Sequence, residues 1–307
     1  MTKAGLDLRM LLDEDSVRRH LRMDELIPAM ARALADFSAG NVAQPVRQMF
    51  PVSGRPGFFA TMPASTLTAL GAKLVTFYPE NRGVPTHHAL IQLFHPETGA
   101  PLVTMDGRLI TEMRTAAVSA VATRHLARPD AAVLAILGSG VQAGSHLEAL
   151  PLVRAFTDVR VWSPRGAEEF ARQHGVRASR SAEEAVHGAD VVVVATSSRT
   201  PVLRREWLAP GAHVNAVGAC RPDWRELDDA LMHDGRLFVD SREAASRESG
   251  DVIAAKEIVA EIGEVVAGTS AGRRSESEIT VFKSVGLAVE DVVAAEIVYR
   301  KSLESPS

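Results

Sequence analysis

The sequence predicts a two-domain α/β protein in which a doubly wound parallel sheet is combined with an α+β domain. The chain has 307 residues, more than a single compact domain usually holds. Its central third alternates short apolar runs with amphipathic stretches, a pattern typical of parallel sheets covered by helices on both faces. One run, residues 191–194, is four consecutive valines, as expected for a strand buried on both faces.

The elements expected in the central third follow this alternation. Strands are predicted at 133–137, 159–162, 190–195, 213–217 and 237–239. Helices are predicted at 141–150, 167–174 and 182–186. We place this domain at residues 114–286.

The first 113 residues lack the alternation and predict an α+β domain. Six residues share one helical face, namely Leu26, Ile27, Met30, Ala31, Leu34 and Phe37. Pro28 is expected in the first turn of this helix, where a missing N–H costs nothing. Short strands are predicted at 46–50, 57–62, 72–78, 89–94 and 102–105, with a turn at Pro96-Glu-Thr-Gly99, and a helix at 115–126 leads into the central domain.

The C-terminal helix is expected at 288–300, where one face carries Val289, Val292, Val293, Ile297 and Val298. We expect this helix to return to the N-terminal part of the chain. The first domain would then be discontinuous, with residues 1–113 plus 287–307.

A glycine motif follows the first predicted strand of the central domain. The chain reads Gly138-x-Gly140-x-x-Ala143, directly before an amphipathic stretch. In a Rossmann dinucleotide site the first glycine permits the tight turn, the second lets the backbone approach a pyrophosphate, and a small third residue allows close packing. The free N–H groups at the start of the helix then bind the phosphates. The alternative is a glycine-rich turn that binds no ligand.

The end of the second predicted strand favours NADPH over NADH. NAD sites usually carry an acid about 20 residues after the glycines, which binds the ribose 2′-hydroxyl. Here the chain reads Trp162-Ser163-Pro164-Arg165 and has no carboxylate. A hydroxyl and a guanidinium suit a 2′-phosphate. The alternative is a simple turn with a solvated arginine.

Composition excludes several classes of protein. The net charge of −4 and the pI near 6.2 argue against a nucleic-acid partner. The single cysteine, Cys220, excludes an internal disulfide and a cysteine-rich zinc site, and no HExxH motif occurs, so no metal is expected. No apolar run is long enough to span a membrane, and the N-terminus lacks a signal-like core. We therefore expect a cytoplasmic protein without a membrane partner.

Three basic residues interrupt apolar or small surroundings before the central domain. They are Arg47 in Gln44-Pro-Val-Arg47, Lys73 in Gly71-Ala-Lys-Leu-Val-Thr-Phe77, and Arg114 in Glu112-Met-Arg-Thr-Ala-Ala117. Each alone would be taken for a surface charge. Together they suit a small carboxylate substrate, bound by the guanidinium forks and neutralised by the ammonium.

At these motifs the chain resembles the ornithine cyclodeaminase/mu-crystallin family. The shared segments also include Arg114-Thr-Ala-Ala-Val-Ser119, Pro210-Gly-Ala-His-Val-Asn-Ala-Val-Gly218, Arg221-Pro-Asp-Trp-Arg-Glu-Leu-Asp228, Glu248-Ser-Gly-Asp251 and Val281-Phe-Lys-Ser-Val-Gly286. The resemblance spans essentially the whole chain, and 221–228 is most similar to the ketimine reductase branch. It implies a Rossmann domain inserted into a discontinuous domain that binds substrate and forms a homodimer.

The resemblance also implies site residues. Arg47, Lys73 and Arg114 would be the catalytic residues that hold the substrate carboxylate. The other pocket-lining positions would be His87, Cys220, Arg221, Glu248 and Ser249. The cofactor-contacting positions would be Thr86, Arg114, Thr115, Gly138, Ser139, Gly140, Val141, Gln142, Ser163, Arg165, Thr196, Ser197, Val217 and Val285. Between Trp162 and Phe170 the chain is two residues shorter than its relatives, so which residue replaces their phosphate-binding arginine stays open.

Cys220 separates the possible reactions. Cyclodeaminases and archaeal alanine dehydrogenases of this family carry an aspartate there, and a thiol with a pKa near ~8.5 is a poor acid/base substitute. Imine reduction has no such requirement, so Cys220 is expected to be a small buried residue. The resemblance thus implies NADPH-dependent reduction of cyclic ketimines. Alternatives are an ornithine cyclodeaminase, an alanine dehydrogenase, or a non-catalytic protein that binds NADPH and thyroid hormone.

Overall fold

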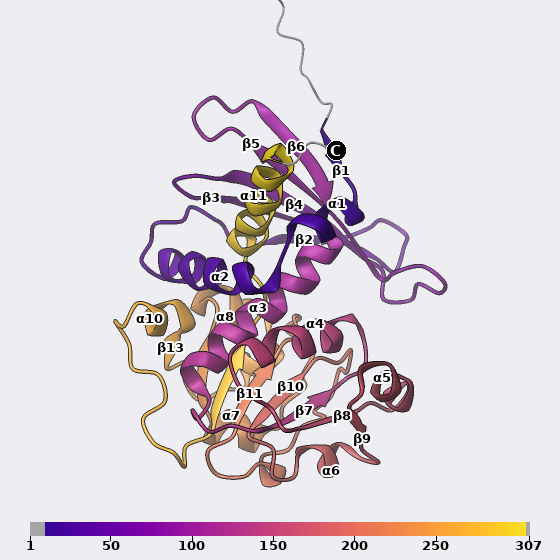
Figure 1. The fold of residues 1–307 in the computed structure, drawn as a ribbon, viewed down its shortest axis with the longest axis vertical. Coiled ribbons are helices and arrows are strands. Elements are labelled where there is room, and N and C mark those ends of the chain that lie inside the picture. The colour runs from indigo at the N-terminus through magenta and orange to yellow at the C-terminus, as the bar shows by residue number, and fades with distance from the viewer. Residues whose placement is uncertain (1–9, 305–307) are drawn as a thin grey trace, which may run out of the picture. The chain divides into compact units, whose positions relative to one another are not determined.

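The structure is a computed structural model that describes residues 10–304 (Figure 1). The chain divides into two compact units. The first unit ends at Arg114 and resumes at Leu287, and the second unit is Thr115–Gly286. From the sequence, we assign Arg114 to the central domain. In the structure, Arg114 is instead the last residue of the first segment of the discontinuous unit.

A six-stranded sheet forms the framework of the first unit. Its described strands are β1 (Leu11–Leu12), β2 (Gln48–Pro51), β3 (Phe58–Ser65), β4 (Leu70–Phe77), β5 (His87–Phe94) and β6 (Pro101–Asp106). They lie in the order β1-β6-β5-β4-β3-β2, antiparallel except for the β1–β6 pair. Along β3, the buried Ala60, Met62 and Ala64 alternate with more exposed residues, so one face is covered and the other is open.

Helices cover one face of this sheet. The helices of the first unit are α1 (Glu14–His20), α2 (Met23–Ser38), α11 (Ala288–Glu304) and the beginning of α3 (Arg108–Leu126), which continues into the second unit. The yellow helix α11 lies against β3, β4 and β5 and packs on α2 (Figure 1). The expected return of the C-terminal helix to the N-terminal region is therefore confirmed.

Two details of the predicted helices are wrong. Helix α2 begins at Met23, so Pro28 lies in its second turn, where its missing N–H leaves the carbonyl of Asp24 without the usual helical partner. Burial of Leu26, Ile27, Met30 and Leu34 outweighs that loss. The helix expected at 115–126 starts seven residues earlier, at Arg108, because Asp106 accepts the Arg108 N–H at 2.9 Å.

The second unit is a parallel eight-stranded sheet, which confirms the doubly wound fold. Its described strands are β7 (Val133–Leu137), β8 (Asp158–Trp162), β9 (Arg177–Ala178), β10 (Val191–Val194), β11 (His213–Ala216), β12 (Arg236–Val239), β13 (Ala260–Glu261) and β14 (Thr280–Lys283). Their order is β13-β12-β14-β11-β10-β7-β8-β9, and every pair is parallel. The strand order reverses between β7 and β10, where open α/β sheets bind ligands.

The helices of this unit follow the strands. Those described are α4 (Val141–Ala149), the 3₁₀ helix η1 (Leu150–Leu152), α5 (Ala167–His174), α6 (Ala182–Val186), the 3₁₀ helix η2 (Arg205–Trp207), α7 (Asp229–Asp234), α8 (Arg242–Glu248), α9 (Gly250–Ile253) and α10 (Ile262–Val266). Sequence reasoning missed β14, which lies between β11 and β12 although it comes last in the chain. Four residues after a polar loop carry too weak a signal to predict a central strand.

Neither a membrane-spanning helix nor a metal-binding cluster is found among the described residues. Between residues 10 and 304, no helix combines the length and the hydropathy that crossing a membrane requires. In the same range, no group of three or more His, Cys, Asp or Glu side chains is placed to hold a metal ion.

Candidate active site

Lys73 lies on the covered face of the first unit's sheet. Strand β4 turns Gly71 and Lys73 toward this face, and Lys73 is only 2 % exposed. Its Nζ lies 2.6 Å from Asp291 Oδ2 and 3.4 Å from Thr111 Oγ1. A lysine so deeply buried needs a counter-charge, and the first turn of α11 supplies it.

Arg114, on α3, shares the same carboxylate. Its Nε donates to Asp291 Oδ1 at 3.1 Å, and its Nη1 donates to Glu290 Oε2 at 2.6 Å. Glu290 and Asp291 are fully buried, and Arg114 is 5 % exposed. The predicted residues Lys73 and Arg114 therefore meet at a carboxylate pair that the sequence analysis did not include.

The environment of Lys73 makes its ammonium more acidic. Burial is the largest cause, and the charges of Arg114 and Arg47 act in the same direction. Asp291 opposes them, and the pKa of Lys73 falls from 10.5 to about 8. At this pKa the side chain is mostly protonated at neutral pH and can still release its proton.

Arg47 joins the group through its charge and its position. It is half-buried and lies near enough to lower the pKa of Lys73. The segment that carries it is fixed by Gln44, whose Oε1 accepts the Val289 N–H at 2.9 Å, at the start of α11. The same helix end therefore binds Lys73, Arg114 and the Arg47 segment.

His87 borders this group and is neutral at physiological pH. It stacks on Phe77 with a ring-centroid distance of 4.4 Å, and its Nδ1 lies 3.1 Å from Thr86 Oγ1. Desolvation, followed by the charges of Lys73 and His88, lowers the pKa of His87 to about 4. His87 thus adds polarity but no charge near Lys73.

Arg47, Lys73 and Arg114 together form a cationic group. Lys73 and Arg114 pair with Glu290 and Asp291, and Arg47 lies near enough to lower the pKa of Lys73. Guanidinium and ammonium groups gathered in this way suit the carboxylate of a small ligand. Sequence reasoning missed Glu290 and Asp291, although two adjacent acids at the start of an otherwise apolar helix were a usable signal.

The glycine loop of the second unit has the geometry of a phosphate site. Gly138 has φ +117°, and a Cβ there would clash with the carbonyl oxygen of Ala195 at the end of β10. Gly140 begins α4 without a side-chain cap, and the space where its Cβ would lie is open. The start of α4 can therefore receive a phosphate, so these residues fit a dinucleotide.

The loop after β8 lies beside the glycine loop. The hydroxyl of Ser139 donates to the carbonyl oxygen of Arg165 at 3.0 Å. Ser163 is half-buried and Arg165 is exposed. In addition, the buried Oε1 of Gln142, in the first turn of α4, has no hydrogen-bond partner. Polar groups at the edge of the sheet thus remain available to a ligand.

The other expected cofactor positions follow the neighbouring strands. Thr196 and Ser197 come after β10, Val217 after β11 and Val285 after β14. Thr86 lies just before β5 in the first unit, and Thr115 and Val141 lie in α3 and α4. The carboxyl ends of parallel strands meet at one edge, so the positions after β7, β8, β10, β11 and β14 share the binding edge of the sheet.

The pocket positions of the second unit form a group of their own. Cys220 is half-buried, not buried as expected from the sequence. Its thiol lies 3.4 Å from the carbonyl oxygen of Val217 and 3.8 Å from that of Ser284, and its single proton can be donated to either. The carbonyl oxygen of Arg221 accepts the Gly250 N–H at 3.0 Å, which brings Arg221 close to Glu248 and Ser249. Ser249 is fully buried, and its hydroxyl caps α9 by accepting the Val252 N–H.

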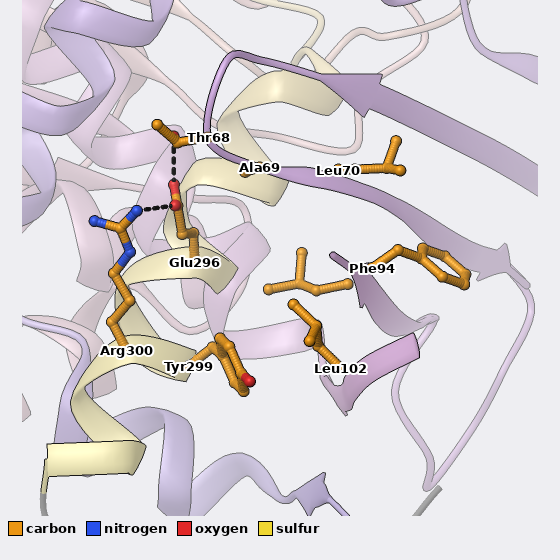
Figure 2. A pocket seen from close by; sticks show the side chains of 9 residues that line it. Thr68, Ala69, Leu70, Phe94, Leu102, Glu296, Tyr299 and Arg300 are labelled. Carbon is orange, nitrogen blue, oxygen red and sulfur yellow. Dashed lines mark hydrogen bonds and ion pairs between the residues drawn. The ribbon is translucent and has the colours of Figure 1, made fainter. Parts of the chain in front are cut away.

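A cavity in the first unit lies apart from the cationic group. Figure 2 shows it beside the C-terminal half of α11, where Glu296 accepts hydrogen bonds from Thr68 and Arg300. Its lining residues are Thr68, Ala69, Leu70, Leu93, Phe94, Leu102, Glu296, Tyr299 and Arg300. None of the predicted site residues lines this cavity.

Known proteins resemble the chain along its whole length. Ketimine reductase mu-crystallin of Rattus norvegicus is 51 % identical over 301 residues, which cover 94 % of this chain and 96 % of the relative. The structure of Thermococcus litoralis Δ1-pyrroline-2-carboxylate reductase in complex with NADH and L-proline has a TM-score of 0.92 and 39 % identity, with 96 % of this chain and 98 % of that chain covered.

An archaeal alanine dehydrogenase dimer with bound NAD is also similar. Its TM-score is 0.91 at 35 % identity, and 96 % of each chain is covered. The sequence model of the ornithine cyclodeaminase/mu-crystallin family matches residues 8–306. The resemblance stated from the sequence motifs is thus confirmed, and the chain belongs to the ornithine cyclodeaminase/mu-crystallin family.

Proposed function

We propose that this protein is an NADPH-dependent ketimine reductase. Its substrates are cyclic ketimines of the pyrroline-2-carboxylate and piperideine-2-carboxylate type, and its products are cyclic imino acids such as L-proline and L-pipecolate. The observation that carries the proposal is the cationic group, in which the buried Lys73 and Arg114 share Asp291 and Arg47 lies close by, because such a group suits a carboxylate ligand. The similarity to the rat ketimine reductase and to the Thermococcus pyrroline-2-carboxylate reductase supports the same reaction.

Each residue of the cationic group has a part in this proposal. Arg47 and Arg114 bind the substrate carboxylate through their guanidinium groups. Lys73 donates a proton to the imine nitrogen, for which a pKa of about 8 is suitable. When bound, the dihydronicotinamide supplies the hydride that reduces the imine carbon. The C=N bond becomes a CH–NH bond, with one hydride on carbon and one proton on nitrogen.

The reductase proposal predicts a specific substrate range. With NADPH, the protein should reduce pyrroline-2-carboxylate and piperideine-2-carboxylate. It should release no ammonia from L-ornithine, because Cys220 replaces the aspartate of the cyclodeaminases. Absorbance at 340 nm and an ammonia assay measure both reactions. Pyruvate with ammonia serves as the alanine dehydrogenase control. Ornithine turnover, or tight NADPH binding without reduction of any imine, would contradict the proposal.

Variants at Lys73 and Cys220 serve as the matched controls of this prediction. Lys73→Ala should lower kcat by about 10² or more, the usual scale for a lost general acid, whereas Cys220→Ser should retain most activity. In the unmodified protein and in Cys220→Ser, kcat/KM should fall as the pH rises through about 8, because protonated Lys73 is the donor. Lys73→Arg, which stays charged, should lack this fall. If Cys220→Ser were inactive and Lys73→Ala had normal activity, Cys220 and not Lys73 would be the proton donor.

NADPH is the proposed cofactor, in preference to NADH. The described loop after β8 offers Ser163 and Arg165, and the residues directly after Trp162, from 163 to 167, include no acid. The hydrogen bond from Ser139 to the Arg165 carbonyl keeps this loop beside the glycine turn. The two similar structures contain NADH and NAD, which are the cofactors bound by those proteins. The preference for NADPH is proposed for this chain from its own loop after β8.

Replacement of Arg165 should therefore change cofactor choice. Arg165→Ala should raise the KM for NADPH by about tenfold or more and leave the KM for NADH within about twofold, since one charge-assisted phosphate contact is lost. Arg172→Ala is the control, because this exposed arginine of α5 already pairs with Glu169. Steady-state kinetics with both cofactors measures the effect. Equal use of both cofactors by the unmodified protein would overturn the preference.

We also propose that the protein is a cytoplasmic homodimer that assembles through the first unit. The open face of its sheet carries apolar side chains: Leu74 and Leu90 lie directly opposite each other on β4 and β5 and are 39 % and 49 % exposed. Phe50, on the edge strand β2, is 52 % exposed. A second copy of the chain would cover these residues, and the dimer of the similar archaeal alanine dehydrogenase supports this assembly.

Light scattering tests the dimer. The unmodified protein should give twice the chain mass of 32.9 kDa, and Leu90→Arg should shift it toward one chain mass, because a charge cannot be buried unpaired at the interface. Leu152→Arg is the control, since Leu152 is similarly exposed, at 50 %, but lies in the second unit. A monomer at micromolar concentration would refute the assembly.

A further inference from the structure

Three of the motifs that identify the family meet in a buried charge cluster of the second unit. Glu226, Asp251 and Lys283 come from the segments 221–228, 248–251 and 281–286, and all three are fully buried. The Nζ of Lys283 lies 3.8 Å from Glu226 Oε2 and 3.6 Å from Asp251 Oδ2. None of the three is among the site residues predicted from the sequence.

Glu226 binds the loops that follow two central strands. Its Oε1 accepts from the N–H of Thr196, at 2.8 Å, and from the Thr196 hydroxyl, at 2.7 Å. Its Oε2 accepts from the N–H groups of Gly218, at 2.8 Å, and Ala219, at 2.9 Å. Four donors surround one carboxylate, and only the ionised form can accept from all of them.

The packing around Glu226 leaves no room for an added methyl group. A Cβ on Gly218 would clash with both the Thr196 carbonyl oxygen and the Glu226 carboxylate. The loops after β10 and β11 therefore approach each other through a glycine, and Glu226 joins them. Lys283 compensates the charge of Glu226, while Asp251 fixes the Glu226 backbone by accepting its N–H at 3.0 Å. Burial is the largest cause of the raised pKa of Glu226, and the charge of Asp251 adds to it, while Lys283 and the hydrogen bonds from Thr196 oppose it.

Asp240 does the same for a third loop. It follows β12, is fully buried, and its Oδ2 accepts from the Ser284 hydroxyl at 3.0 Å. The same oxygen accepts from the N–H groups of Val285 and Gly286, both at 2.7 Å. These residues follow β14, so Asp240 holds the loop that contains Val285.

We infer that Glu226 and Asp240 are positioning residues for the nicotinamide cofactor. The loops that they hold follow β10, β11 and β14 and carry Thr196, Val217 and Val285, positions that the family resemblance assigns to cofactor contact. Fixed loops bind a ligand without an ordering cost, so loosening them weakens cofactor binding. This inference rests on the proposed dinucleotide-dependent function.

The test compares two isosteric changes at opposite edges of the same sheet. In Glu226→Gln, an NH2 group replaces one of the two carboxylate oxygens. This group cannot accept from the N–H donors of the loop that it faces, so the hydrogen bonds to that loop are lost. Its Kd for NADPH, measured by fluorescence titration without substrate, should rise by about tenfold. The control is Asp190→Asn, since Asp190 accepts the N–H groups of Ala132 and Val133 at the amino end of β7. The control should lose thermal stability but keep its Kd within about twofold.

Kinetics separates positioning from a general loss of structure. At saturating NADPH, Glu226→Gln should keep the KM for the imine within about threefold, because the cationic group of the first unit is untouched. If Glu226→Gln does not fold, Asp240→Asn takes its place with the same expected rise in Kd. A lowered Tm with an unchanged Kd in the folded variant would overturn the inference and leave the reductase proposal standing. Failure of the unmodified protein to bind NADPH would overturn both.

Discussion

The contact on which the first unit depends is the one that buried Asp291 makes with both Lys73 and Arg114. Without this carboxylate, the buried Lys73 would lose its ion-pair partner and Arg114 would keep only Glu290, at a cost of several kcal/mol for an uncompensated buried ion. The first turn of α11 supplies Asp291 and Glu290, and Gln44 fixes the same turn to the segment of Arg47. The fold thus holds three cations together, in an arrangement that suits the carboxylate of a ligand.

The second unit uses buried carboxylates differently. The fully buried Glu226 and Asp240 accept main-chain N–H groups and so fix loops at the ends of parallel strands, and the half-buried Asp190 does the same at the start of β7. In the first unit, by contrast, Glu290 and Asp291 pair with side-chain cations and set the charge of the site and the acidity of Lys73. Carboxylates of the first kind, which accept main-chain N–H groups, determine where loops lie. Carboxylates of the second kind, which pair with side-chain cations, determine which ligand and which proton transfer the site favours. In the proposed reaction, the first kind fixes the cofactor and the second kind tunes Lys73 as the proton donor.

Much of the fold followed from local sequence patterns. The helices at 167–174 and 182–186 and the strand at 133–137 have the predicted bounds, because periodicity and glycine turns are local signals. Strand β14 and the partners of Lys73 were missed because they depend on residues far apart in the chain: Asp291 lies 218 positions after Lys73. The basic residues could be singled out as charges in apolar surroundings, but which acids balance them is a property of the tertiary structure.

The central claim is that the cationic group binds the carboxylate of a ligand through its charge, and a pair of planar ligands tests it. Pyrrole-2-carboxylate and pyrrole-2-carboxamide differ in charge but hardly in shape, and neither can be reduced by a hydride. Calorimetric titration of the NADP-loaded protein at pH 7 should show binding of the carboxylate and at least about tenfold weaker binding of the amide, since charge-assisted hydrogen bonds are lost. Equal affinity for the two ligands would contradict the claim.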